Sequence, residues 1–149
     1  MREVMFRKTV LTLVSMIVAA PLAVADVATA DTNPDGIWRL TSGRVTVKVV
    51  HCGANICANI VALASPNYPD GTPLLDALNP NTALRKRPVL GLPVISGMTK
   101  IGPNTYKGYI YNADDGGSYR ATATLTDTTM KLKGCWIVFC RDNDFVRIK

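Results

Sequence analysis

Glutamate and histidine are almost absent from this chain of 149 residues, which has one of each, Glu3 and His51. No Ser–His–Asp arrangement can be assembled when the single histidine lies beside Cys52. Strong helix formers are also sparse, whereas Thr, Val, Gly, Asn, Asp and Pro are plentiful. This composition predicts a β-protein.

The cysteines lack the spacings of metal and thiol redox sites. Zinc ligands are typically spaced C-x2-C with further Cys or His residues, and redox sites use C-x-x-C at the start of a helix. Both cysteine pairs here are C-x4-C instead. Basic residues are scattered apart from residues 85–87, so a nucleic-acid surface lacks its usual cluster. We therefore expect no metal, no cofactor and no nucleic-acid partner.

The first 30 residues have the three parts of a cleavable signal peptide. A basic segment precedes an uncharged apolar run over residues 10–24, and two Ala-x-Ala sites follow. We expect a leader over residues 1–25, cleaved after Ala25 or alternatively after Ala30. The run falls short of the about 20 apolar residues that a membrane-spanning helix needs, so we expect membrane contact only through the leader.

After the leader, residues 31–149 form the expected single domain. Loss of residues 1–30 removes three basic and two acidic residues, which changes the formal charge from +6 to +5. The domain keeps four cysteines, and in an oxidising compartment two disulfides are the default. Cysteines five residues apart lie opposite each other in a hairpin with a four-residue loop, at a separation that suits a disulfide.

The two cysteine pairs differ in the residues between them. Residues 53–55 have turn composition, which predicts a Cys52–Cys57 disulfide. The second pair encloses the apolar residues 136–139, which do not have turn composition. Two alternatives follow: a local Cys135–Cys140 bond, which we prefer, and crossed pairing of Cys52 with Cys140 and of Cys57 with Cys135.

Period-two alternation of apolar and polar residues, as in residues 45–50 and 118–125, predicts seven or eight short strands in sequential hairpins. The last of these strands is expected over residues 145–148. Residues 65–88 are rich in turn residues and predict a long irregular loop. The most economical fold is all-β, a small antiparallel up-and-down barrel of about eight strands, because closure leaves no bare edge.

A series of short motifs follows in fixed order along the domain. They are Gly36-x-Trp38, Cys52-Gly53-x3-Cys57, Asp76-x2-Asn79-Pro80, Leu84-Arg85-x-Arg87-Pro88, Gly91-Leu92, Gly108-x-Ile110-Tyr111, Asp115-Gly116-x2-Tyr119, and Gly134-Cys135 with Cys140-Arg141. Through them the chain resembles the domain of unknown function 2147 family of small exported bacterial proteins. It departs from that pattern at Ala58, Tyr106 and Phe145. The resemblance implies a lipocalin-like barrel in the periplasm or extracellular space of a bacterium, and it implies no reaction.

Gly-x-Trp on a first strand with an arginine near the C-terminus is also how lipocalin-like barrels close. The similarity implies that Arg147 stacks on Trp38 across the barrel floor. The alternative is that Trp38 is simply a core aromatic residue.

The favoured function is non-catalytic binding of a small apolar or amphiphilic ligand, and one form of this hypothesis has an anionic ligand. Arg85 and Arg87 suit an anionic headgroup because guanidinium groups form bidentate hydrogen bonds. The candidate ligand-binding residues are Asp76, Asn79, Arg85, Arg87 and Tyr111. In the alternative interpretation, the two arginines pair with Asp76 or with loop carbonyls and hold the long loop together.

Two other function classes stay open. An envelope protein that binds a partner would use residues 136–139 as a contact point, provided that they form an exposed hairpin tip. A hydrolase-type enzyme would use Asp76 or the pair Asp114 and Asp115, although that pair lies where a hairpin turn also favours aspartate. The sequence leaves the oligomeric state open.

Overall fold

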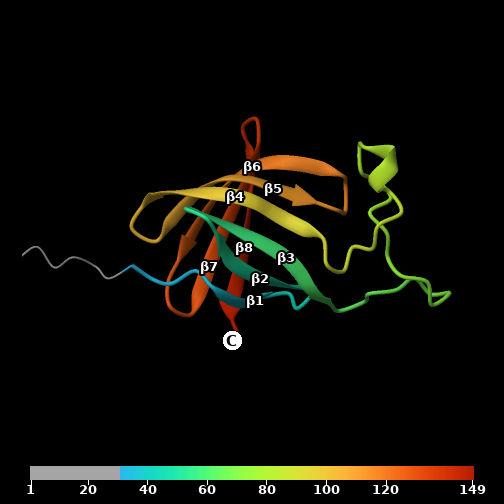
Figure 1. Ribbon diagram of the computed structural model, residues 1–149, viewed down its shortest axis with the longest axis horizontal. Coiled ribbons are helices and arrows are strands. Elements are labelled where there is room, and N and C mark those ends of the chain that lie inside the picture. Colours follow the sequence, from blue (N-terminus) through green and yellow to red (C-terminus); the bar gives the residue numbers. More distant parts are fainter. Residues whose placement is uncertain (1–30) are drawn as a thin grey trace, which may run out of the picture.

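The computed structural model describes residues 31–149 as one closed barrel of eight antiparallel strands in sequential order (Figure 1). The strands are β1 Gly36–Leu40, β2 Val45–Cys52, β3 Asn55–Leu63, β4 Pro93–Gly102, β5 Thr105–Asn112, β6 Gly117–Leu125, β7 Thr129–Trp136 and β8 Phe139–Arg147. The predicted all-β up-and-down barrel is confirmed. The expected leader and both expected cleavage sites lie outside the described residues.

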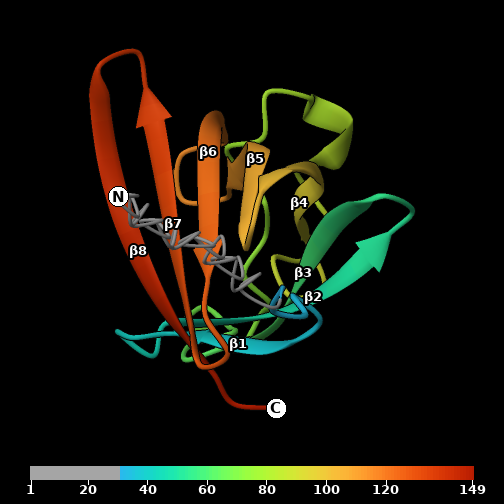
Figure 2. The same ribbon diagram turned by 90° about the vertical axis from the view of Figure 1, so that its left-hand side faces the viewer.

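Closure of the barrel depends on β1, which pairs with β2 on one side and with β8 on the other. The β1–β8 pairing is short and involves only Phe145–Arg147 of β8, whereas β7 and β8 pair as far as Trp136 and Phe139. The β7–β8 hairpin therefore extends beyond the barrel wall (Figure 2). The expected last strand over residues 145–148 was too short, because the strand begins at Phe139.

Apolar side chains from all eight strands fill the barrel. The largest fully buried ones include Trp38, Ile56, Met98 and Met130. The rest of the buried apolar core consists of Val47, Val49, Ala58, Ile60, Leu92, Ile95, Tyr106, Ala121, Ala123, Leu125, Leu132 and Phe145. Burial of this much apolar surface is the main stabilising contribution to such a small domain.

The floor of the barrel lies where the N-terminal segment, β1 and the C-terminus meet. The guanidinium of Arg147 lies 4.2 Å from the centre of the Trp38 ring. Its nitrogens donate to the carbonyls of Asp127, Asp35 and Asn33 at 2.7, 2.6 and 2.6 Å. This one side chain therefore links the end of β8 to the segment before β1 and to the turn between β6 and β7. Among residues 31–149, no helix has the length and apolar character needed to cross a membrane.

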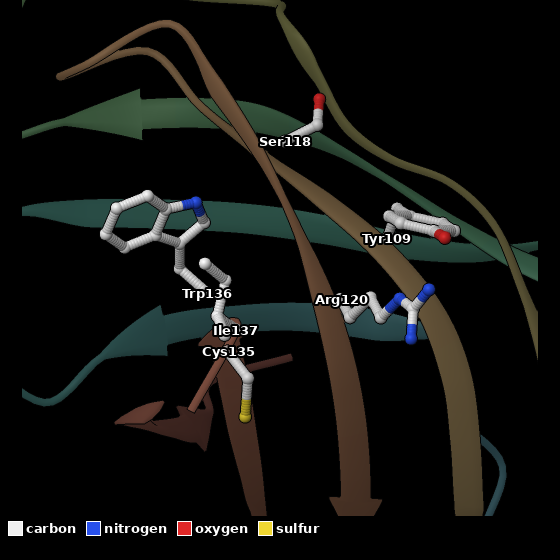
Figure 3. A pocket seen from close by; sticks show the side chains of 6 residues that line it. All are labelled: Tyr109, Ser118, Arg120, Cys135, Trp136 and Ile137. Atoms are coloured by element: carbon white, nitrogen blue, oxygen red, sulfur yellow. The ribbon is translucent and has the colours of Figure 1, made fainter. Parts of the chain in front are cut away.

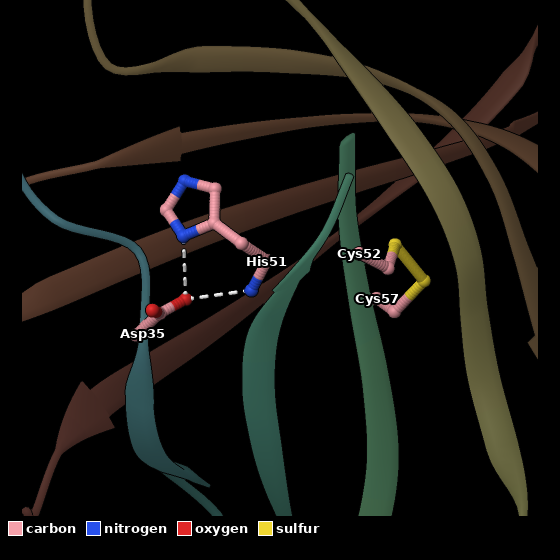
Figure 4. Close-up of a disulfide and its surroundings, with 4 residues drawn as sticks. All are labelled: Asp35, His51, Cys52 and Cys57. Carbon is pink, nitrogen blue, oxygen red and sulfur yellow. Dashed lines mark hydrogen bonds and ion pairs between the residues drawn. A yellow bond between two sulfur atoms is a disulfide. The ribbon is translucent and has the colours of Figure 1, made fainter. Parts of the chain in front are cut away.

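The first disulfide joins Cys52 to Cys57 at the floor end of the barrel (Figure 4). Its register differs from the expected one: Cys52 pairs with Asn55 and Cys57 with Val50, so the two cysteines are diagonal neighbours with Cα atoms 5.8 Å apart. The turn has two residues instead of four, because Gly53 adopts a φ of +72° that closes the hairpin tightly.

The second disulfide joins Cys135 to Cys140, so the crossed pairing is not formed. Here the two cysteines lie directly opposite each other, with Cα atoms 4.0 Å apart. The bond lies close to the end of the protruding β7–β8 hairpin, one residue pair below Trp136 and Phe139, and the loop consists of residues 137 and 138.

The single histidine has a place in the fold that the sequence did not predict. Asp35 accepts a hydrogen bond from the backbone N–H of His51 and contacts its Nδ1, both at 2.8 Å (Figure 4). The contact ties the segment before β1 to the end of β2.

Candidate functional site

The segment over residues 64–92, which we call the long loop, connects β3 to β4 at the end of the barrel opposite the floor (Figure 1). It contains one turn of 3-10 helix, Thr82–Leu84, and an isolated bridge between Leu75 and Pro88. The bridge brings the two limbs of the loop together, so that the N–H of Asp76 donates to the carbonyl of Arg87 at 3.0 Å.

The carboxylate of Asp76 is the centre of the loop and is fully buried. Its Oδ1 accepts from the Tyr111 hydroxyl at 2.5 Å. Its Oδ2 accepts from Asn79 Nδ2 at 2.8 Å and from Arg87 Nε at 2.9 Å, and Arg87 Nη2 lies 2.8 Å away. Tyr111 belongs to β5, so this network fastens the long loop to the barrel wall.

Arg85 takes part in the same cluster through a carbonyl group. Its Nε donates to the carbonyl of Asn79 at 2.7 Å. The five residues expected to bind a ligand therefore lie together, but they bond chiefly to one another. Within residues 31–149, every buried polar side-chain atom has a hydrogen-bond partner.

The electrostatics of the cluster favour a charged Asp76. Burial acts to raise the pKa of Asp76, but hydrogen bonds from Tyr111, Asn79 and Arg87 together with the Arg87 charge outweigh it and lower the pKa. Burial and the hydrogen bond to Asp76 raise the pKa of Tyr111, so its hydroxyl stays a donor. An ionised acceptor surrounded by donors is a stable anchor and not a poised general acid.

The other candidate carboxylates lie in the β5–β6 turn. Asp114 pairs with Arg44 at 3.2 Å, and both side chains are largely exposed. Asp115 accepts from Tyr119, from Asn112 and from a backbone N–H within the turn. These contacts are those of a turn, where aspartate satisfies backbone and neighbouring side chains.

A separate pocket of about 420 Å³ lies on the outer wall, beside the protruding hairpin (Figure 3). Its lining residues are Tyr109, Ser118, Arg120, Cys135, Trp136 and Ile137. Figure 3 shows the indole of Trp136 on one side and the side chains of Tyr109 and Arg120 on the other. The pocket thus combines an apolar side with a cationic and hydroxyl-bearing side.

Strand register explains how this pocket forms. Arg120 of β6 lies opposite Tyr109 of β5 on one side and opposite Cys135 of β7 on the other. Ser118, two residues away on the same outer face, lies opposite Tyr111. Side chains directly opposite on neighbouring strands are within contact distance, so the three strands present one continuous surface at this level.

Sequence reasoning missed Tyr109, Ser118 and Arg120 as site residues. Each occupies an outward position of an alternating strand, but only the register shows that they share one patch with Cys135. The enclosed apolar residues 136–139 were the one available signal for this end of the barrel.

Comparison with known proteins agrees with the architecture. The solved structure of protein HP1028 from the human pathogen Helicobacter pylori, which is described as belonging to the lipocalin family, superposes with a TM-score of 0.67 at 22% identity. The match covers 79% of this chain and 84% of that chain. The fold is therefore that of a lipocalin-like β-barrel. No curated protein matches the chain.

The family follows from a second match. The bacterial family described as "Uncharacterized protein conserved in bacteria (DUF2147)" matches residues 36–147. The chain belongs to this family.

Proposed function

We propose that this protein is a non-catalytic binding protein for a small amphiphilic anion, exported to an oxidising compartment of a bacterial cell. The observation that supports the ligand class is the lining of the half-open pocket on the outer wall, which places Arg120 beside the apolar side chains of Trp136 and Ile137. Two disulfides are compatible with export.

The pocket suits a ligand with one charged end. Arg120 offers a planar guanidinium that can bind a carboxylate or phosphate through two hydrogen bonds. Within residues 31–149 no hydrogen bond or ion pair occupies it. Trp136 and Ile137 offer an apolar surface for the remainder of the ligand.

The Asp76 cluster has a different role in this proposal. Because Asp76 and Asn79 are buried and bonded to their neighbours, they hold the long loop against β5. Within the described residues, the one side-chain hydrogen bond of Arg85 is that of its Nε to the carbonyl of Asn79. Its remaining donors are the part of the originally expected site that stays available to a ligand.

The first experiment is native mass spectrometry of protein purified from its own compartment, to detect a retained small molecule. The second is calorimetric titration with decanoate as an amphiphilic probe. Arg120→Met should weaken decanoate binding about tenfold, because it removes the cationic partner of the carboxylate.

Arg39→Met is the matched control, since Arg39 is exposed on β1, away from the pocket residues. It should leave decanoate affinity unchanged. Equal affinities of the wild type, Arg120→Met and Arg39→Met for decanoate would refute the pocket as the binding site. Absence of binding to the wild type would refute the ligand class.

A further inference from the structure

The tip of the β7–β8 hairpin, residues 136–139, is the most exposed apolar segment of the described chain. Trp136, Ile137, Val138 and Phe139 are 63%, 82%, 77% and 73% exposed. The tip rises above the barrel in both views (Figures 1 and 2). Four consecutive apolar side chains in this position contribute nothing to the core, and such clusters mark interaction surfaces.

The residues at the tip are not those that a two-residue turn favours. A two-residue hairpin loop favours glycine or asparagine, because the backbone there adopts positive φ. Ile137 occupies that position with a φ of 53°, which is unfavourable for a β-branched residue. The Cys135–Cys140 disulfide joins the two strands directly below the tip. The protein therefore retains large apolar side chains at a local cost.

In strand register, the first charged residues below the tip are both positive. Arg120 lies opposite Cys135, level with the disulfide, and Arg141 lies opposite Gly134, one residue pair below it. Neither arginine has an ion pair with another residue in the described part of the chain. The nearest acidic residue along the hairpin, Asp142, lies opposite Lys133, one position further from the tip.

We propose that this tip inserts into the surface of a lipid bilayer with anionic headgroups. A tryptophan with aliphatic neighbours suits the boundary between headgroups and acyl chains. Arginines at the next level would meet the phosphates, which gives the attraction its dependence on anionic lipid. The insertion is shallow and reversible, as expected for a few side chains without a membrane-spanning segment.

Charge complementarity favours the bilayer over a second copy of the chain. Two tips packed symmetrically would each bring Arg120 and Arg141 to the same interface, where like charges repel. An anionic lipid surface meets the same arginines with opposite charge. The proposal goes beyond ligand binding, and it replaces the expectation that only the leader contacts the membrane with a second contact through residues 136–139.

The experiment uses protein expressed with its own leader and purified, so that every variant carries the same N-terminus. Trp136 is exposed and Trp38 is fully buried, so a change in tryptophan emission reports on the tip. Vesicles of equimolar phosphatidylglycerol and phosphatidylcholine should shift the emission to shorter wavelength, and brominated lipids should quench it. Phosphatidylcholine vesicles should give a much smaller change, and Trp136→Phe should abolish the shift while sedimentation still shows binding.

Val138→Asp should lower the partition coefficient at least about tenfold, because it places a carboxylate where the tip enters the bilayer. Phe139→Ser is a second tip variant and should act in the same direction. Ile101→Asp is the matched control: Ile101 is 59% exposed in β4, near the floor end of the barrel. It should leave the partition coefficient within about twofold of the wild type.

Several outcomes would overturn the proposal. The wild type would not bind anionic vesicles, or it would bind phosphatidylcholine vesicles equally well. Alternatively, Val138→Asp and Ile101→Asp would lower the partition coefficient by the same factor. Self-association that Val138→Asp abolishes, without vesicle binding, would identify a second copy as the occupant instead. Decanoate titration without vesicles separates this result from the proposed function, because Val138 and Phe139 do not line the pocket.

Discussion

Substitution of Asp76 tests whether the buried cluster holds the long loop. Four donor contacts converge on its two oxygens, from Tyr111, Asn79 and both Nε and Nη2 of Arg87. Asp76→Ala leaves these donors without an acceptor. Because removal of one partner from a buried ion pair costs about 3–5 kcal/mol, we expect a loss of unfolding free energy in the lower part of that range. Arg87 is 31% exposed and can regain some hydration.

Asp76→Asn keeps the shape and removes the charge. The new amide can direct its oxygen toward Arg87 and donate its N–H to the oxygen of Tyr111, so the geometry survives. The charge-assisted bonds become neutral ones, which are about half as strong. We therefore expect a destabilisation of about 2–3 kcal/mol. Asp70→Asn is the control, because Asp70 is an exposed residue of the same loop that bonds only within its turn.

The stabilising contribution of the Asp76 carboxylate should decrease at low pH. The pKa of Asp76 is lowered in the folded protein, so its stabilising contribution is complete above the unfolded value of about 3.9 and is lost as pH falls through the folded pKa. The difference in unfolding free energy between the wild type and Asp76→Asn should thus be constant from about pH 7 to pH 5 and shrink below about pH 4.

Urea denaturation followed by circular dichroism measures these differences, and hydrogen exchange of the amides in residues 64–92 detects local opening of the loop. Both should respond to Asp76→Asn. Equal effects of Asp76→Asn and Asp70→Asn on both measurements would refute the proposed role of ionised Asp76. The same conclusion would follow if the difference in unfolding free energy between the wild type and Asp76→Asn did not change below about pH 4.

The remaining predictions concern the floor of the barrel and the contact between the long loop and Gly116. Arg147→Met should destabilise the protein by about 3 kcal/mol, from its stacking on an indole and its half-buried charged hydrogen bond, whereas Arg39→Met should cost under about 0.5 kcal/mol. Similar urea midpoints for these two variants would contradict the role of Arg147. Gly116→Ala should cost at least about 3 kcal/mol, because a Cβ there would lie 1.9 Å from the carbonyl oxygen of Leu78 at a φ of +70°. Gly71→Ala shares the positive φ of +85° but has open space around it, so thermal unfolding should show only about 1 kcal/mol; equal costs would mean that the loop does not press on Gly116.

The barrel could be predicted because its signals are local. Alternation along residues 45–50 and 118–125, with turn residues between the strands, determines strands and hairpins without knowledge of the partner strands. The register at the first disulfide could not be derived, since C-x4-C fits opposite cysteines around a four-residue loop and diagonal cysteines around a two-residue loop. Gly53 decides between them, through a positive φ that only the structure reveals.

The candidate sites divide in the same way. The candidate residues of the long loop lie within twelve consecutive positions and could be grouped from the sequence; they are Asp76, Asn79, Arg85 and Arg87. The sequence could not show that their hydrogen bonds are made chiefly within the cluster, because that network includes Tyr111 from β5. The pocket was missed since its members come from three strands and meet only through register. Chemistry within one segment was therefore predictable, and chemistry assembled across strands was not.

Residues 136–139 show why a conflict with local preference is informative. Their composition argued against a turn, and the sequence left crossed disulfides as the alternative to a local Cys135–Cys140 bond. The local Cys135–Cys140 bond removes that alternative, so the apolar side chains have no core to enter. Ile137 at positive φ and the exposed Trp136 do not stabilise the folded domain. Residues with a purely structural role usually have local conformational preferences that agree with the fold. In our proposal, contact with a surface outside the barrel supplies the balancing contribution, and Arg120 and Arg141 favour an anionic surface for that contact.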